Sequence, residues 1–329
     1  MGDPAGSGPE ILLKALMKDG LLSKASFVLI GDLGVFRRAS ETLGTRGLHF
    51  AEITEPSAVT EAHDVVNVVD LKNVSLGELV YGKPSLLGGK AAYQCIVKAV
   101  DYAVRGWVHA VVTAPISKES LNMAGYNYPG HTELLAELTK AKEVKMMLVA
   151  EHFRVVHVTT HVSMRGAIEL IRKARILETL ELTIESLRDM FGIEVPRVAV
   201  AGLNPHAGEG GLFGDEEIRE ITPAIVEARG KGMNVLGPYP PDTVFYRAYH
   251  NREFDAVVAM YHDEGHIAMK MVGLMEGVNV TLGLPIIRVS PDHGTVWGKA
   301  GKGTADENAT VEAMKLAAVL AVKKYRLQD

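Results

Sequence analysis

Residues 255–263 have the sequence DAVVAMYHD, an apolar run that ends on a histidine and an aspartate. Two more runs have this form: Arg154–Thr160 precedes His161, and Arg197–Leu203 precedes Asn204-Pro205-His206. Short apolar runs of this kind predict buried strands. Ligands gather at the carboxyl ends of the strands in parallel α/β folds. The sequence therefore predicts a metal site ligated by His161, His206 and His262, with coordination left open for substrate or water.

Each histidine taken alone could have only a structural role, because a single histidine after a strand commonly closes a turn or caps a carbonyl. Three histidines at the same topological position, with Asp263 beside the third, favour the functional interpretation.

Composition limits the class of protein. The chain has 329 residues, 47% of them apolar and 23% charged, with a net charge of −5. This is an ordinary balance for a soluble protein with one large α/β domain or two lobes, and it argues against bulk nucleic-acid binding. The single cysteine, Cys95, rules out an intrachain disulfide and a cysteine-rich zinc site. We find no signal segment and no apolar stretch of about 18 residues, so we expect a cytoplasmic protein without a membrane span.

Short apolar runs alternate with amphipathic ones along the chain. Strands are predicted at Ser26–Gly31, Val65–Leu71, His109–Thr113, Lys145–Ala150 and Val278–Leu282, besides the three runs above. Helices are predicted at Pro9–Lys18, Gly89–Arg105, Thr132–Leu138, Ala174–Phe191, Asp215–Gly230 and Asp306–Tyr325. This alternation predicts a largely parallel sheet with helices on both faces. The glycine- and proline-rich segments Gly208–Gly214 and Gly237–Pro241 are interpreted as active-site loops. The chain opens on a turn-rich loop that normally follows a strand, so we expect a short first strand to be missing; a free N-terminal tail is the alternative.

Spacing argues against two nucleotide-binding motifs. Gly208–Gly214 is off by one from a dinucleotide fingerprint, and Gly294–Lys299 is one residue short of a Walker loop. Better candidates for an anion are the helix start at Gly130-His131-Thr132-Glu133 and the basic residues Lys270 and Arg288. Thr132 is otherwise a plain helix cap, and isolated basic residues are usually solvated.

Several motifs together carry a resemblance to a known family. They are Gly2-Asp3-Pro4-Ala5-Gly6 with Gly8-Pro9-Glu10, Gly130–Glu133, Leu203–Glu209, Gly237-Pro238 with Asp242-Thr243, Tyr261-His262-Asp263, Val278–Pro285 and Asp292–Thr295. In this order, over nearly the whole chain, they resemble the 4-hydroxythreonine-4-phosphate dehydrogenase (PdxA) family.

The resemblance implies an architecture and an assembly. The fold would be the two-lobed α/β/α type of isocitrate and isopropylmalate dehydrogenases, with the active-site cleft between the lobes. We expect a cofactor-side lobe at residues 1–125 plus 285–329, and a metal, substrate and dimerisation lobe at 126–284. The protein would be a homodimer with a shared active site, and His262 would come from the neighbouring subunit.

The resemblance also implies an activity. It is the oxidation, with decarboxylation, of a 4-phosphorylated hydroxy acid, which uses NAD and a divalent metal (Zn, Co or Mg). The metal ligands would be the three strand-end histidines. The remaining roles would fall as follows: substrate binding to His131, Thr132, Lys270, Asn279 and Arg288; catalysis to Lys270, Asp242 and Asp263; cofactor binding to His293, Gly294 and Asp306.

Departures from the family pattern concern the substrate. Glu264 stands where glutamine is common, Gly265-His266-Ile267 replaces a Gly-Leu-Pro-like segment, and Val296–Lys299 differs from the usual run. The Gly265-His266 segment looks closer to the branch that acts on D-threonate or D-erythronate 4-phosphate, with dihydroxyacetone phosphate as product, than to the branch of pyridoxine biosynthesis. Two other classes stay open: a phosphate acyltransferase of related fold, and a catalytically silent protein that binds a phosphorylated metabolite.

Overall fold

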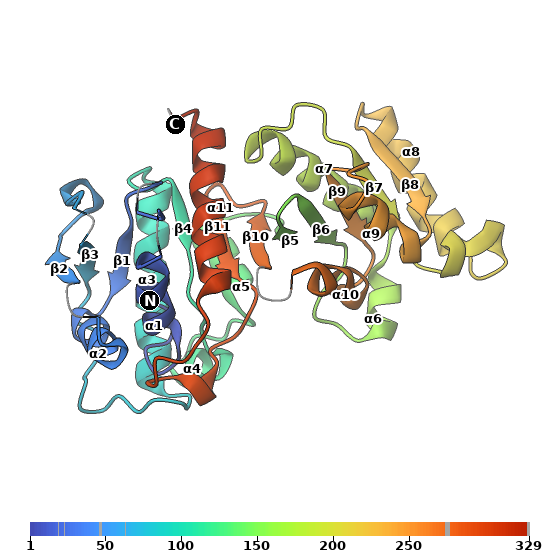
Figure 1. The fold of residues 1–329 in the computed structure, drawn as a ribbon. Coiled ribbons are helices and arrows are strands. Elements are labelled where there is room, and N and C mark those ends of the chain that lie inside the picture. The colour runs from blue at the N-terminus through green and yellow to red at the C-terminus, as the bar shows by residue number, and fades with distance from the viewer. Residues whose placement is uncertain (19, 23, 46–47, 63, 274–276, 328–329) are drawn as a thin grey trace. The chain divides into compact units, whose positions relative to one another are not determined.

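A computed structural model describes the chain except for residues 19, 23, 46–47, 63, 274–276 and 328–329. The chain forms two compact units (Figure 1). Unit 1 consists of Met1–Lys142 and Leu284–Tyr325, and unit 2 of Glu143–Gly283 with Arg326 and Leu327. The division lies later in the chain than the predicted boundary after residue 125, so His131 and Thr132 belong to unit 1.

Unit 1 contains two groups of parallel strands. One is a three-stranded sheet in the order β1 (Val28–Gly31), β3 (Val65–Asp70), β2 (His49–Glu52). The other is the pair β4 (Ala110–Val112) and β11 (Ile287–Pro291). The helices are α1 (Gly8–Leu16), α2 (Leu33–Leu43), α3 (Leu86–Val104), α4 (Lys118–Met123), α5 (His131–Thr139) and α11 (Asn308–Tyr325). Both α1 and α11 contribute to the main apolar core of the unit, which explains their broad apolar faces.

Unit 2 contains six strands in the order β10 (Val278–Leu282), β5 (Lys145–Ala150), β6 (Phe153–His157), β9 (Ala256–Ala259), β7 (Val198–Ala201), β8 (Val235–Tyr239). The pairs β10–β5 and β5–β6 are antiparallel, and the pairs from β6 to β8 are parallel. The central strands are buried along their whole length, as expected when helices cover both faces of a sheet.

The helices of unit 2 are α6 (Met164–Leu170), α7 (Lys173–Asp189), α8 (Thr222–Gly230), α9 (Pro241–Tyr249) and α10 (His262–Gly273). Alternate residues of β9, Val257 and Ala259, share one apolar cluster with residues of α9 and α10. Helix α7 packs along the same strands and contributes no residue to that cluster. The strands therefore separate α9 and α10 from α7 (Figure 1).

The α/β class and the mostly parallel strands are confirmed, and some details differ from the sequence expectations. Strands β2, β8 and β11 and helices α2, α4, α6, α9 and α10 are additional elements. The predicted loop Gly237–Pro241 is wrong in part, because Gly237 and Pro238 lie within β8. Proline is tolerated there because β8 is the outermost strand of its group. The predicted helix Asp215–Gly230 is a π-helical turn, η3 (Glu217–Ile221), that continues into α8.

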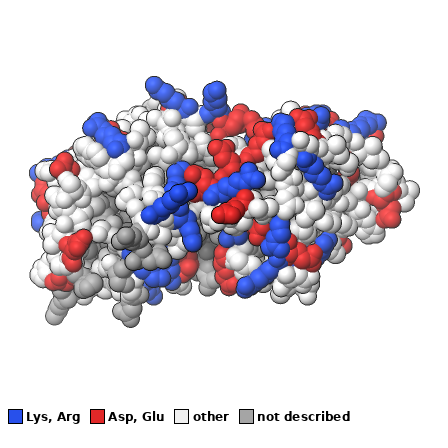
Figure 2. Space-filling view, turned by 90° about the horizontal axis from the view of Figure 1, so that it is seen from above, with Lys and Arg blue, Asp and Glu red and all other residues white. Residues whose placement is uncertain are grey.

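The surface carries mixed charge. On the face drawn in Figure 2, acidic and basic side chains are interspersed rather than gathered into a basic stripe. Among the described helices, none has both the length and the apolarity needed to cross a bilayer.

Candidate functional site

The three predicted metal ligands follow three neighbouring parallel strands of unit 2. His161 comes four residues after β6, His262 begins the helix after β9, and His206 lies in the segment η2 (Pro205–Gly211) that follows β7. Strands β6, β9 and β7 are adjacent and parallel, so their carboxyl ends share one edge of the sheet. The topological part of the prediction is therefore met within unit 2.

Two of these rings are neighbours in one chain. The ring centroids of His161 and His262 are 5.6 Å apart. An imidazole nitrogen lies about 2 Å from a bound zinc ion, which puts the centroids of two tetrahedrally placed rings about 5 Å apart. The spacing of His161 and His262 is therefore compatible with one shared cation.

Carboxylates bind the Nδ1 atoms of two of the candidate ligands. Asp263 Oδ1 lies 2.6 Å from Nδ1 of His262, and Glu209 Oε2 lies 2.8 Å from Nδ1 of His206. An Nδ1–H that donates to a carboxylate fixes the tautomer with an unprotonated Nε2, the arrangement typical of metal-ligating histidines. The donor set therefore fits a divalent cation, and Asp263 orients the ring of His262, a candidate ligand.

His206 sits on an unusual backbone. Five consecutive residues, His206–Gly210, have φ between 46° and 81° and form a left-handed turn. Each non-glycine residue in this conformation costs roughly 1–2 kcal/mol. The side chain is largely exposed and packs edge-on against Phe213. Strain of this kind persists only where the surrounding structure enforces it.

The three candidate histidines do not form one cluster within the described part of a single chain. Among the described residues, no three histidine, cysteine or acidic side chains converge closely enough to hold a metal ion. His161 and His262 are in mutual ring contact, whereas the described ring contact of His206 is with Phe213.

Two further histidines, His266 and His157, pack against His262, and the sequence did not predict these ring contacts. The ring of His266 stacks on His262 with centroids 3.7 Å apart and planes at 14°, and its Nδ1 lies 2.9 Å from the His262 carbonyl oxygen. His157, which ends β6, packs 4.7 Å from His266 and is 1% exposed. Burial, with smaller contributions from the neighbouring imidazoles, lowers the pKa of His157 to about 3. The signal in the sequence was the spacing of four between His262 and His266, which puts both on one face of a helix.

Gly265 and Glu264 also lie in this group of buried residues next to His262. A Cβ at Gly265 would lie 2.3 Å from Nε2 of His157, so no other residue fits without displacing that ring. Glu264 Oε2 accepts the N–H of Met260 at 2.5 Å, and burial raises the pKa of Glu264 to about 8. The three residues 264–266, which depart from the family pattern, are thus buried next to His262.

The other predicted residues of unit 2 lie on three elements. Lys270 is exposed on α10, two turns after His262. Asp242 is exposed in the first turn of α9, a helix that contacts η2. Asn279 lies on β10, and its Oδ1 is shielded from solvent with no hydrogen bond to the described residues.

Unit 1 brings together two of the predicted anion-binding residues, His131 and Arg288. The buried guanidinium of Arg288, on β11, donates from Nη2 to Oγ1 of Thr113 at 2.8 Å, and burial lowers its pKa to about 10. His131 begins α5, and burial, followed by the nearby charge of Arg288, holds its pKa well below the usual value. Thr132 follows in the same helical turn. A buried cation beside the N-terminus of a helix is suited to a phosphate or carboxylate.

The predicted cofactor residues lie in the segment before α11. His293 Nδ1 lies 3.0 Å from the carbonyl oxygen of the exposed Gly294. The carboxylate of Asp306 accepts the N–H of Asn308 at 2.8 Å, which is a helix-capping contact. The opening loop supports this segment, because Ser7 N–H donates to Thr295 O at 3.0 Å and Glu10 Oε2 accepts Gly303 N–H at 2.9 Å.

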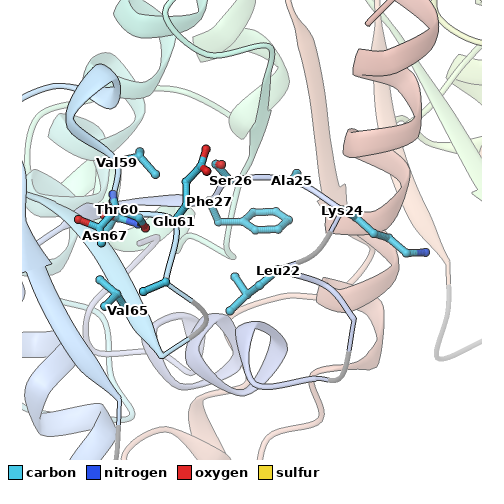
Figure 3. Close-up of a pocket in the computed structure, with 11 residues that line it drawn as sticks. Leu22, Lys24, Ala25, Ser26, Phe27, Val59, Thr60, Glu61, Val65 and Asn67 are labelled. Carbon is cyan, nitrogen blue, oxygen red and sulfur yellow. Dashed lines mark hydrogen bonds between the residues drawn. The ribbon is translucent and has the colours of Figure 1, made fainter. Parts of the chain in front are cut away.

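Unit 1 also contains a pocket of about 330 Å³ that is lined by none of the predicted site residues (Figure 3). Residues before β1 and β3, among them Phe27 and Glu61, line it together with Val65 and Asn67 in the first half of β3. It therefore lies at the amino ends of these strands, whereas ligands of parallel α/β sheets bind at the carboxyl ends.

Comparisons with known proteins identify the family. The family model described as pyridoxal phosphate biosynthetic protein PdxA matches residues 23–317. D-threonate 4-phosphate dehydrogenase of Salmonella typhimurium is 46% identical over 98% of this chain and 97% of its own length. 4-Hydroxythreonine-4-phosphate dehydrogenase of Beijerinckia indica is 47% identical over 98% of this chain and 94% of its own length.

A solved structure gives the same assignment. The crystal structure of 4-hydroxythreonine-4-phosphate dehydrogenase from Klebsiella pneumoniae superposes with a TM-score of 0.92 at 43% identity, covering 98% of this chain and 96% of that one. The chain therefore belongs to the PdxA family and is an oxidoreductase of the 4-hydroxythreonine-4-phosphate dehydrogenase type.

Proposed function

We propose that the protein oxidises and decarboxylates a 4-phosphorylated hydroxy acid, with NAD as hydride acceptor and a divalent metal ion in the site. The observation that carries this proposal is the pair His161–His262 at a ring distance of 5.6 Å, with the Nδ1 atoms of His262 and His206 bound by carboxylates. A histidine that only closes a turn has no need of an Nε2 left ready for a ligand.

We infer that two chains complete the metal site. His161 and His262 come from one chain in this proposal, and His206 comes from the partner. This allocation differs from the expectation that His262 crosses the interface, and the in-chain contact of His262 with His161 supports it. Imidazole ligands are compatible with zinc or cobalt more readily than with magnesium.

Exposed apolar side chains around the histidines support a homodimer. Ile267 and Met271 on α10 are 64% and 82% exposed, and Leu212, next to η2, is 72% exposed. Val162 and Met164 beside His161 are about half exposed. Apolar side chains gathered around one site mark a surface that a partner covers. A second copy that covers them would also bring its own His206 to this region.

The phosphate of the substrate would bind in unit 1 at Arg288, His131 and Thr132. A guanidinium binds phosphate through paired hydrogen bonds, and the neutral imidazole of His131 can donate one without adding charge. Such remote contacts supply binding energy that orients the reacting carbon.

The remaining predicted residues would bind the carboxylate of the substrate and accept the proton of its hydroxyl. The exposed ammonium of Lys270 and the amide of Asn279 can hold the polar groups of the substrate, and Asp242 can accept a proton from its hydroxyl. A divalent cation there supplies a Lewis acid that polarises this hydroxyl and stabilises developing negative charge. Asp263 orients His262 in this proposal. The adenosine part of NAD would be held near His293 and Gly294, in the segment braced by Ser7 and Glu10.

An absorbance assay for NADH tests the proposal. The full-length protein should reduce NAD with D-threonate 4-phosphate, D-erythronate 4-phosphate or 4-phosphohydroxythreonine, and a chelator should abolish the rate until Zn²⁺ or Co²⁺ is restored. The ratio of kcat/KM for these substrates assigns the branch.

His262→Ala should lose at least about a hundredfold in kcat/KM, because the cation loses a direct ligand. The proposal fails if metal-free protein reduces NAD at the full rate, or if the protein forms acyl phosphates without nicotinamide.

A further inference from the structure

The left-handed turn His206–Gly210 requires something to hold it. His206, Ala207 and Glu209 are not glycines, and their φ values are 54°, 54° and 46°. L-residues rarely adopt this conformation even singly, and the turn contains five residues in succession. The turn also places His206 and its carboxylate partner Glu209 side by side, 2.8 Å apart. Whatever fixes the turn therefore fixes the direction of the His206 ring.

The carboxylate of Glu217 is bound to the chain just before the turn. Its Oε1 accepts the backbone N–H groups of Leu203 and Asn204 at 2.7 and 2.8 Å. Its Oε2 accepts the side-chain amide of Asn204 at 2.9 Å. Glu217 is 3% exposed, so these three hydrogen bonds replace its hydration.

The same carboxylate also packs against glycines on both sides of His206. A Cβ at Gly202 would lie 3.1 Å from Oε1 of Glu217, and a Cβ at Gly208 would lie 2.8 Å from Oε2. The glycine at 208 therefore serves two purposes, because its φ of 81° also suits the left-handed turn. Glu217 is thus in contact with the segment before the turn and with the middle of the turn.

Glu217 lies at the start of the π-helical turn η3. A π-helical turn is a rare local geometry that occurs frequently at functional sites. Its neighbour Glu216 makes a second contact to Asn204 Nδ2, at 2.7 Å. Two adjacent carboxylates thus converge on one asparagine side chain, and the hydrogen bond from Asn204 lowers the pKa of Glu216.

We propose that Glu217 is a positioning residue for metal binding: it clamps the left-handed turn so that His206 points its Nε2 out of its own chain. This inference rests on the proposed function, in which His206 is a metal ligand. Glu217 touches neither the cation nor the substrate. It acts by making the strained turn the lowest-energy conformation before the cation arrives, so metal binding does not have to order the loop.

The test is the affinity of the full-length protein for Zn²⁺, measured after metal removal by competition with a chromophoric chelator. Glu217→Gln keeps the size of the side chain but places an NH₂ group against Asn204 Nδ2, so one acceptor is lost. We expect the Zn²⁺ dissociation constant to rise by about 10–100-fold, as for other residues that orient metal ligands.

The matched control is Glu220→Gln on the same π-helical turn. Glu220 accepts the N–H of Lys173 at 2.7 Å and pairs with Arg172, which are structural contacts. This variant should leave the Zn²⁺ dissociation constant within about twofold of the wild-type value, whatever it does to the melting temperature. A merely structural role for Glu217 predicts that both variants keep the wild-type Zn²⁺ affinity, and that result overturns the inference.

A second variant decides the matter if Glu217→Gln does not fold. Asn204→Ala removes the side-chain donor and leaves the two backbone hydrogen bonds, so a smaller loss of Zn²⁺ affinity is expected. Visible absorption of the Co²⁺-substituted protein gives an independent measure, because a displaced imidazole changes the intensity of the cobalt bands. Wild-type affinity together with a wild-type Co²⁺ spectrum in this variant would rule the clamp out.

His206→Ala separates this inference from the proposed function. If wild type and His206→Ala bind Zn²⁺ equally, His206 is not a ligand and the proposed function fails. If His206→Ala loses Zn²⁺ while Glu217→Gln and Asn204→Ala retain it, the proposed function stands and only the positioning role is wrong.

Discussion

At the scale of single residues, the burial of His157 has a measurable consequence. Its imidazole is 1% exposed beneath His266 and His262, and burial lowers its pKa to about 3. The folded protein therefore keeps this ring neutral at pH values where the unfolded chain, with a histidine pKa near 6.5, takes up a proton. Below about pH 6.5 proton uptake favours the unfolded state, so this histidine makes stability fall as pH falls toward 3.

His157→Leu should remove this pH dependence. Between pH 6.5 and 4.5 the free energy of unfolding of the wild type should fall by about 2 kcal/mol more than that of the variant. The measurement is urea unfolding of metal-stripped protein at both pH values. His250→Leu, a change at an exposed histidine in the same unit, is the control and should keep the wild-type dependence. Parallel pH profiles for wild type and His157→Leu would contradict the account.

The candidate residues that could be predicted from the sequence are those whose partners lie close to them along the chain. The histidines after strands, and Asp263 beside His262, could be found because strand ends and adjacent residues are visible in the sequence. Glu217 could not be found, because its partners Leu203 and Asn204 lie 13–14 residues earlier and meet it only through the fold. Nor does any sequence rule anticipate five successive residues in the left-handed region, three of them not glycine.

Among the secondary-structure elements, the apolar runs predicted as strands were found, and two of the three missed strands, β2 and β8, lack the usual pattern of a buried strand. β2 is partly exposed and short, with a burial pattern that shows no alternation. β8 is interrupted by Gly237 and Pro238, which normally indicate a loop. The antiparallel pairing of β5 and β6 was missed because both runs were expected in a parallel arrangement, although only Glu151 and His152 separate them. A two-residue connection requires a hairpin.

Close packing of α3 against α4 depends on one glycine. A Cβ at Gly89 would lie 1.9 Å from the carbonyl oxygen of Ser120, so Gly89→Ala must push the two helices apart. We expect a loss of about 1–3 kcal/mol in the free energy of unfolding, as for other overpacked sites. Trp107 and Trp297 are the two tryptophans of the chain and both lie in unit 1, so their fluorescence during urea unfolding reports on the unit that contains Gly89.

Gly77→Ala is the matched control for that change. A Cβ at Gly77 would have no atom within 4 Å, and it lies in the same unit. This variant should remain within about 0.5 kcal/mol of the wild type. Equal stabilities for Gly89→Ala and Gly77→Ala would show that α3 and α4 do not approach each other as closely as described.

In the molecule as a whole, the candidate site residues are distributed over both units. The candidate metal ligands and Lys270 belong to unit 2, whereas Arg288, His131 and the segment with His293 belong to unit 1. The sequence predicted a discontinuous first lobe, because the resemblance extends from the first residues to the last helix. The sequence alone could not assign the three histidines to one chain or to two, because that allocation depends on the positions of their side chains in the folded protein.

In the proposed site, one cation is held by three imidazoles from two chains. Hybrid dimers test this arrangement; they are made by co-expressing two variants with different tags and purifying on both tags. A hybrid of His206→Ala and His262→Ala chains contains one site with all three histidines intact. We predict about half the wild-type activity and one Zn²⁺ per dimer, whereas each parent variant is inactive.

A hybrid of His161→Ala and His262→Ala chains is the matching control. It should stay inactive, because these two histidines serve the same site from the same chain and neither site is complete. An inactive, metal-free His206/His262 hybrid would contradict the shared site, and recovery in the His161/His262 hybrid would contradict the allocation of His262.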